Sequence, residues 1–249
     1  MHRNIFSVGT NAKTVKGEKY GYLTGVLYLA PDSLSGHQVC PMARKAGCVN
    51  ACLNSAGRGA FTSVQSARIA KTRRYFAERA VFMADIVFSI QTLVRKASKL
   101  KMIPLVRLNG TSDIRWESVP VTIGNVRYSN VMHAFPNVQF YDYTKLANRK
   151  GIPANYDLTF SYSGLPGFAS QVAIAKKAGM RIAVVFRTRE SIPATFIGLD
   201  TVDGDDSDIR HIDPQGVVVA LYAKGKAKKD TSGFVVDAGR KVFHIALAA

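Results

Sequence analysis

The chain has three cysteines, and all of them lie within a segment of thirteen residues. Cys40, Cys48 and Cys52 follow a C-x7-C-x3-C spacing, and Pro, Gly, Asn and Lys flank them rather than apolar runs. Thiolates this close in sequence can converge on one metal ion or cluster. Three thiols without an obvious fourth leave one iron of a four-iron cluster open to a small molecule. The spacing therefore favours an iron–sulfur cluster on these three residues.

Three other interpretations of the cysteines stay open. A zinc ion would take His37 as its fourth ligand, in an H-x2-C-x7-C-x3-C pattern with tetrahedral sulfur and nitrogen ligation. A nucleophilic thiol would need a histidine partner, which a single sequence does not identify. Free cysteines also serve as small buried apolar residues.

A polar segment follows the apolar residues 103–108. We expect Asn109, Thr111, Ser112 and Asp113 to bind a nucleoside cofactor or substrate. Asp113 could also hold a ribose, bind a cation or take a proton. The same residue types form Asx and Ser/Thr turns that cap a following helix, which is the structural alternative.

Further polar side chains follow the later apolar segments. Asp142 and Lys145 come after one such segment and Ser161 after the next. We expect Asp142 and Lys145 to join Asp113 as catalytic residues, and Ser161 to join the cofactor-binding group. The alternative for Asp142 and Lys145 is a surface ion pair, which contributes ~0–1 kcal/mol.

An acidic segment at 200–208 carries five aspartates. Its composition suggests calcium or magnesium, but it lacks the glutamate at position 12 of an EF-hand loop. In so basic a protein, a turn whose aspartates pair with nearby Arg and Lys is the favoured interpretation.

The charge balance points to a polyanionic partner. The chain has 34 Lys and Arg against 17 Asp and Glu, a net charge of +17. Nucleic acid is the first candidate and an anionic membrane surface the second. We expect phosphate contacts, and affinity that falls with salt, from two basic groups. They comprise Arg68, Arg73, Arg74, Lys224, Lys226, Lys228 and Lys229.

The elements that must position these residues follow from apolar runs and their spacing. Segments rich in β-forming residues predict strands at 20–30, 103–108, 138–141, 156–160, 181–186 and 217–222. Segment 63–101 has neither Pro nor Gly and predicts two helices, and 168–178 predicts another. Apolar strands separated by helices indicate a parallel sheet covered on both faces. We therefore expect an α/β protein, with a full or partial parallel (β/α) barrel and a cysteine-bearing loop after the first strand.

The expected organisation is a basic N-terminal segment, 1–19, followed by a single α/β domain, 20–249. The sequence lacks an apolar run of eighteen residues and the long apolar region of a signal peptide. Three cysteines do not make a disulfide scaffold. These features predict a cytoplasmic protein that does not enter a membrane, and they leave the oligomeric state open.

Several phrases of the chain together resemble the phage gene product 88 family. They are GYLT at 21–24, LYLAP at 27–31, ACLNSAGRG at 51–59, VRLNGTSD at 106–113, FYDYTK at 140–145 and AKGKA at 223–227. The resemblance covers roughly residues 10–235. It implies a tailed-phage origin, and hence the host cytoplasm, but no activity.

A more distant resemblance is to radical S-adenosylmethionine enzymes. They also place three cysteines in the loop after the first strand of an α/β barrel, and they bind the nucleoside with polar residues at later strand ends. Their usual spacing is C-x3-C-x2-C, and a Gly-Gly-Glu motif follows their next strand. This chain departs from both patterns.

The sequence as a whole predicts an iron–sulfur enzyme that uses S-adenosylmethionine and acts on or near nucleic acid or nucleotides. One alternative is a nucleic-acid-binding protein without activity, in which zinc or the thiols stabilise a loop. The other is a base-exchange or nucleotide-modifying barrel enzyme with structural zinc, whose nucleophile would be Asp113 or Asp142.

Overall fold

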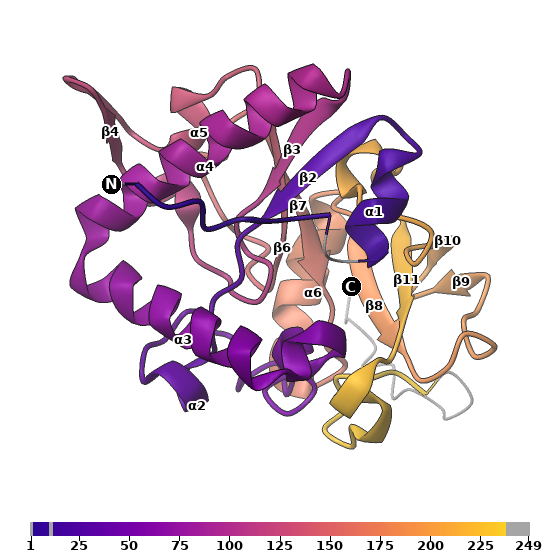
Figure 1. The fold of residues 1–249 in the computed structure, drawn as a ribbon. Coiled ribbons are helices and arrows are strands. Elements are labelled where there is room, and N and C mark those ends of the chain that lie inside the picture. Colours follow the sequence, from indigo (N-terminus) through magenta and orange to yellow (C-terminus); the bar gives the residue numbers. More distant parts are fainter. Residues whose placement is uncertain (1, 10–11, 238–249) are drawn as a thin grey trace.

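The computed structural model describes residues 2–9 and 12–237, and its centre is one nine-stranded sheet. Figure 1 shows this sheet running from β2 through β6 and β7 to β8 and β11. In spatial order the strands are β1 (Ser7–Val8), β2 (Tyr22–Val26), β3 (Ile103–Arg107), β6 (Gln139–Thr144), β7 (Tyr156–Ser161), β8 (Ile182–Phe186), β11 (Val218–Tyr222), β10 (Leu199–Asp203) and β9 (Thr195–Phe196). A separate hairpin pairs β4 (Val121–Ile123) with β5 (Val126–Tyr128).

Every pairing from β2 to β10 is parallel, and the edge strands β1 and β9 pair antiparallel with their neighbours. Within the described residues, no pairing joins one edge of the sheet to the other. The expected α/β class with a largely parallel sheet is therefore confirmed, whereas barrel closure is not found. All six expected strands are present. The additional strand β10 runs through the start of the acidic segment, beside β11.

The predicted helical segment 63–101 forms two helices, α3 (Thr62–Ala77) and α4 (Arg79–Lys99), which are separated at Glu78. The buried side chains Phe82, Ile86, Ile90 and Leu93 recur at helical spacing along α4. They pack with β2 and β3 in the larger apolar core. The apolar periodicity of the sequence thus fixes which face of α4 covers the sheet.

A further helix between parallel strands is α6 (Ala169–Lys177), which leads from β7 to β8. A second apolar core lies here and contains Phe160, Phe168, Val184 and Phe186. The shorter helices are α1 (Ala12–Glu18), α2 (Asp32–Ser35) and α5 (Val131–Ala134). Single 3-10 turns are η1 (Leu53–Ser55), η2 (Gly57–Ala60), η3 (Trp116–Ser118), η4 (Pro166–Phe168), η5 (Arg210–Ile212) and η6 (Gly225–Lys229).

The expected N-terminal segment contributes to the domain. Its residues 7–8 form β1 on the edge of the sheet, and α1 lies against β2. At the other end of the chain, the stretch 238–249 of the expected domain lies outside the described residues. Among the described residues, no helix combines the length and the apolar character needed to cross a membrane.

The parallel order has one consequence for function. The carboxyl ends of parallel strands meet at the same edge of a sheet, and binding sites of open α/β sheets lie outside that edge. The segments after β2, β3, β6, β7 and β11 all begin there.

Candidate functional site

The cysteines lie in residues 36–61, the segment between α2 and α3 that we call the cysteine loop. Three hydrogen bonds fasten this loop to segments that follow β3, β7 and β11. The carbonyl of Val39 accepts from the backbone N–H of Asp113 at 2.8 Å. The carbonyls of Ala46 and Gly47 accept from the hydroxyls of Ser163 and Ser232, each at 2.9 Å. The loop therefore lies across the carboxyl edge of the sheet, as expected for a loop after the first parallel strand.

The three thiols are unbridged and half-buried. Cys48 packs against the second apolar core and also against a small cluster that includes Ala51 and Phe234. The Sγ of Cys52 accepts a 3.5 Å hydrogen bond from the N–H of Asn54. Apolar packing and loop geometry thus hold the cysteines in a sheltered position.

Burial is the largest influence on the three thiols, and it raises the pKa of each one. Charge on Cys48 further raises the pKa of Cys40 and Cys52, so the thiols lie within electrostatic reach of one another. The ammonium of Lys145 opposes these effects, because it lowers the pKa of all three cysteines. The three thiols therefore lie within the electrostatic field of one shared cation.

Lys145 directly follows β6 and is only 6% exposed. Its ammonium donates to the Ser161 hydroxyl at 3.0 Å and lies 4.6 Å from the centroid of the Phe234 ring. No carboxylate of the described residues lies within ion-pairing distance of it. A buried ammonium without a carboxylate is costly unless other groups offset its charge. The three thiols and the carboxylate of Asp113 are ionisable groups that lie in its field.

The structure separates His37 from this arrangement. The ring of His37 stacks on Phe76 of α3, with 4.4 Å between the ring centroids and 9° between the planes. Within residues 2–9 and 12–237, no three His, Cys, Asp or Glu side chains are close enough together to share one metal ion.

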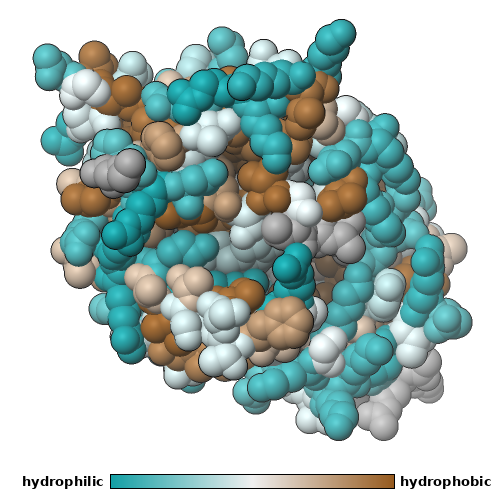
Figure 2. Space-filling view, viewed as in Figure 1, coloured by the Kyte–Doolittle hydropathy of each residue, from teal (hydrophilic) through white to brown (hydrophobic). Residues whose placement is uncertain are grey.

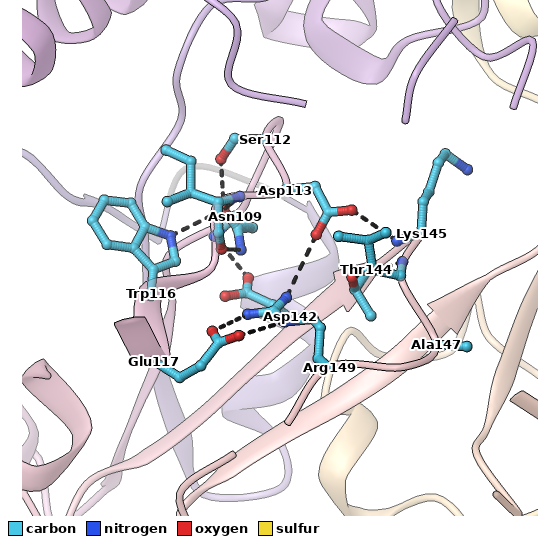
Figure 3. A network of polar contacts seen from close by, with 12 residues as sticks. Asn109, Ser112, Asp113, Trp116, Glu117, Asp142, Thr144, Lys145, Ala147 and Arg149 are labelled. Carbon is cyan, nitrogen blue, oxygen red and sulfur yellow. Dashed lines mark hydrogen bonds and ion pairs between the residues drawn. The ribbon is translucent and has the colours of Figure 1, made fainter. Parts of the chain in front are cut away.

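The polar residues after β3 form a buried network (Figure 3). The side-chain oxygen of Asn109 accepts from the Ser112 hydroxyl at 2.8 Å and from the Trp116 indole N–H at 3.0 Å. The backbone N–H of Asn109 donates to the carboxylate of Asp142 at 2.7 Å. The Thr111 hydroxyl donates to the carbonyl of Leu29 at 2.6 Å. These contacts hold the segment to itself, to the residues that follow β2 and to β6, but no side chain of the segment caps η3, the next helical turn.

The two carboxylates of the expected catalytic group are also internal. Asp113 is 3% exposed and Asp142 is fully buried. Asp113 accepts from the backbone N–H of Lys145 at 2.8 Å, and Arg149 lies 3.5 Å away. Arg149 in turn pairs with Glu117. The oxygens of Asp113 are thus occupied by protein donors.

Asp142 receives hydrogen bonds from Asn109 and from the hydroxyl of Tyr156, the latter at 2.9 Å. Burial raises the pKa of Asp142 to about 7, although Arg107 and both hydrogen bonds favour its charged form. Burial also raises the pKa of Asp113. As placed, both aspartates hold the strand ends together rather than facing solvent.

The expected phosphate-binding arginines of α3 have separate roles. Arg68 is 8% exposed, donates to the carbonyl of Asn54 at 2.7 Å and lies over the ring of Tyr28. It therefore holds the cysteine loop from inside. Arg74 pairs with Asp85 of α4, and Arg73 is exposed. Helical periodicity explains the difference, because Arg68 lies on the buried face of α3 with Thr72 and Tyr75.

The basic run near the C-terminus is more uniform. Lys226, Lys228 and Lys229 are exposed on η6, whereas Lys224 donates to Asp205 at 2.6 Å. The other aspartates of the acidic segment include Asp203, which pairs with Arg189, and Asp208, which pairs with Arg107. Pairing with basic residues was the favoured interpretation of this segment.

Several residues that support the site were not singled out from the sequence. Ser163 and Ser232 tether the cysteine loop, Arg149 links two acidic residues, and Phe234 lies against Lys145. Arg187 follows β8 and donates to carbonyls of η6. The position of Ser163 and Arg187 just after apolar strands was the available signal, whereas Ser232 and Phe234 carried none.

A family model described as Gene product 88 matches residues 4–238. No curated protein and no solved structure matches the chain.

Proposed function

The chain belongs to the gene product 88 family, and we propose that it is an iron–sulfur enzyme that acts on or near nucleic acid or nucleotides. Cys40, Cys48 and Cys52 would hold the cluster at the carboxyl edge of the parallel sheet. The observation that carries this proposal is the placement of the cysteine loop. Three hydrogen bonds fasten it across the edge where Lys145, a buried cation, also lies.

The chemistry of the donor set favours a cluster over a single ion. A single zinc ion holds each sulfur at ~2.3 Å, so its ligands must nearly touch one another. In an iron–sulfur cluster, each cysteine binds a different iron, so the thiols need only surround a larger body. The three unbridged cysteines of one loop could each bind one iron of such a cluster.

Lys145 supports the same proposal. Cysteine-ligated clusters carry negative charge, and nearby positive charge adjusts their reduction potential. The buried ammonium, held by Ser161 and flanked by Phe234, would supply that charge without contacting solvent.

Three cysteines leave one iron without a protein ligand, and we propose S-adenosylmethionine as the small molecule that binds it. Clusters of this type supply the electron that starts radical chemistry on that cofactor. Thr111 and Ser161 are the partly exposed polar residues at the same edge that could hold the cofactor. Asn109, Ser112 and Asp113 would position this edge from inside the protein.

A nucleic-acid partner follows from the charge. The net charge is +17, and the exposed Lys226, Lys228 and Lys229 lie on a turn next to the cysteine loop. A polyanion would therefore approach the same edge that carries the thiols.

Anaerobic purification tests the proposal, followed by an absorption spectrum and analysis of iron, sulfide and zinc. We expect a brown protein with about four irons per chain. Each of the variants Cys40→Ala, Cys48→Ala and Cys52→Ala should lose most of this iron. His37→Ala is the matched control and should keep it, because His37 stacks on Phe76.

Other results would contradict the proposal. One zinc per chain without iron would favour the alternative in which zinc stabilises the loop of a nucleic-acid-binding protein or a base-exchange enzyme. Absence of metal after strictly anaerobic handling would leave the cysteines as buried apolar residues. If the iron is present, adding S-adenosylmethionine should change the electron paramagnetic resonance spectrum of the reduced cluster, and an unchanged spectrum would exclude this cofactor.

A further inference from the structure

The turn η6 is held in a fixed position by one arginine. Arg187 donates to the carbonyl of Lys228 at 3.0 Å and to that of Asp230 at 2.7 Å. The exposed side chains of Lys226, Lys228 and Lys229 extend from this turn, and none of the three forms an ion pair within the described part of the chain. Their charges are therefore presented to solvent.

This turn is packed directly against the cysteine loop. A Cβ added to Gly225 would lie 3.3 Å from the Cβ of Ala56, and Gly225 has a φ of +55°. Ala223 and Ala227 pack with Ala51 of the loop in one small apolar cluster. The lysines of η6 and the end of the cysteine loop thus form one continuous surface.

The end of the cysteine loop carries an exposed aromatic ring. Phe61 is 59% exposed, Leu53 is 53% exposed, and Arg58 between them is also exposed. Residues rise ~2 Å each in a 3-10 turn, so Phe61 at the end of η2 lies within roughly 10 Å of Ala56. Figure 2 shows hydrophilic side chains over the region where Figure 1 draws the yellow turn η6.

We infer that this surface binds single-stranded nucleic acid, with phosphates on Lys226, Lys228 and Lys229 and a base stacked on Phe61. The inference rests on the nucleic-acid partner of the proposed function and locates where that partner binds. Basic residues beside exposed aromatic rings are the combination that single strands require, because every base offers a face for stacking. A duplex does not present an unstacked base to Phe61.

The position of this surface beside the cysteine loop indicates the substrate class. The lysine-bearing turn η6 contacts η1, the turn that directly follows Cys52. A single-stranded nucleic acid bound here would extend along the cysteine loop. The substrate class is thus a nucleotide within a single strand rather than a free nucleotide, because a free nucleotide would not need a separate row of lysines.

Binding of fluorescein-labelled 20-residue oligodeoxythymidylate and oligouridylate to the full chain, followed by fluorescence anisotropy, tests the inference. The triple variant Lys226→Gln, Lys228→Gln, Lys229→Gln should bind more weakly than the wild type. The slope of log affinity against log salt concentration should become shallower by about 2, the value for three lost phosphate contacts with a single strand. The two oligonucleotides show whether the ribose 2′-hydroxyl contributes.

A second triple variant provides the control for net charge. Lys96, Lys99 and Lys177 lie in the last turns of α4 and α6, which lead into the amino ends of β3 and β8. Their replacement by Gln removes the same charge from the opposite edge of the sheet. We expect this variant to keep the slope of the wild type. Equal losses in the two triple variants would overturn the inference, because the binding would then follow net charge alone.

Phe61 is tested separately. Phe61→Ala should weaken binding of the single strand at least about fivefold, which corresponds to the low end of the binding free energy that one stacked base contributes. Phe61→Tyr should restore the binding. Ile103→Ala is the control, because Ile103 is 53% exposed at the amino end of β3. If Phe61→Ala binds as tightly as the wild type, or if a duplex of the same length binds as tightly as the single strand, the inference fails.

These results are separable from those of the metal analysis. The lysine and Phe61 variants should keep the iron content of the wild type, since none of these residues contacts the thiols in the proposed site. Selective loss of binding in a protein without iron would keep this surface and exclude the cluster. If iron is present but the two sets of variants bind alike, the cluster is kept and this surface is excluded.

Discussion

The carboxylate of Asp113 accepts a 2.8 Å hydrogen bond from the backbone N–H of Lys145. Asp113 also donates its own backbone N–H to the carbonyl of Val39, at the same distance. One residue after β3 therefore fixes both the segment that carries Lys145 and the start of the cysteine loop. The position of the buried ammonium relative to the thiols depends on this residue.

Replacing Asp113 tests that dependence. Asp113→Ala leaves a buried N–H without its acceptor and Arg149 with one acidic partner fewer. We expect the free energy of unfolding to fall by about 2–3 kcal/mol. Asp113→Asn keeps an acceptor for Lys145 and should lose less. Urea denaturation measures both variants.

The control for this prediction is Asp206→Ala. The Asp206 side chain is 50% exposed and pairs with Lys19, so its replacement should change the stability by less than about 1 kcal/mol. If Asp113→Ala is no more destabilising than Asp206→Ala, Asp113 does not join the two segments as described.

The stability of the protein should depend on Asp142. Burial raises the pKa of Asp142 from 3.8 to about 7, so the folded protein keeps a proton in this range that the unfolded chain has released. The free energy of unfolding should therefore fall as the pH rises from about 4 to about 7, by at most about 4 kcal/mol. Asp142→Asn removes the titrating group and keeps an acceptor for Asn109.

Urea denaturation of the wild type and of Asp142→Asn across this pH range isolates the effect. The difference in unfolding free energy, wild type minus variant, should fall with rising pH and level off above about pH 7. A difference that stays constant over the range would show that Asp142 titrates near its ordinary pKa in the folded protein.

Lys145 should adjust the reduction potential of the proposed cluster. Lys145→Met removes a buried positive charge from the surroundings of the thiols. Reduction adds negative charge, so we expect the midpoint potential to shift to more negative values while the iron content is kept. Lys150→Met is the matched control, because Lys150 is exposed in the same segment. Equal midpoint potentials in the two variants would show that Lys145 does not adjust the reduction potential of the cluster.

Gly225 should be required for the packing of η6 on the cysteine loop. An alanine there would meet Ala56 at 3.3 Å and adopt a φ of +55°. The left-handed conformation alone costs about 1–2 kcal/mol. Gly216→Ala is the control. Gly216 has a φ of +69° and nothing lies within 4 Å of an added Cβ, so this variant has the backbone strain but no contact with a neighbouring residue.

We therefore expect Gly225→Ala to destabilise the protein more than Gly216→Ala and to be the only one of the two that weakens oligonucleotide binding. Thermal unfolding and fluorescence anisotropy measure the two effects. Equal behaviour of the two variants would show that the contact with Ala56 does not hold η6 in place.

Local patterns in the sequence predicted most of the secondary structure. The apolar segment 181–186 corresponds to β8, and the uninterrupted segment 63–101 corresponds to α3 and α4. Such features depend on neighbouring residues, through apolar spacing and the absence of Pro and Gly. The strand β10 was not expected, because its aspartates indicated a turn, and pairing with β11 and Arg189 stabilises it.

The sequence by itself also determined that the cysteines follow the first parallel strand and that polar residues follow the later strands. Only the tertiary structure decided which of these side chains are available to a ligand. Arg68 and Arg73 look alike in sequence, yet Arg68 is buried and donates to Asn54, whereas Arg73 is exposed. Strand order, closure of the sheet and the pairing of polar groups depend on contacts between distant segments, which local residue patterns do not encode.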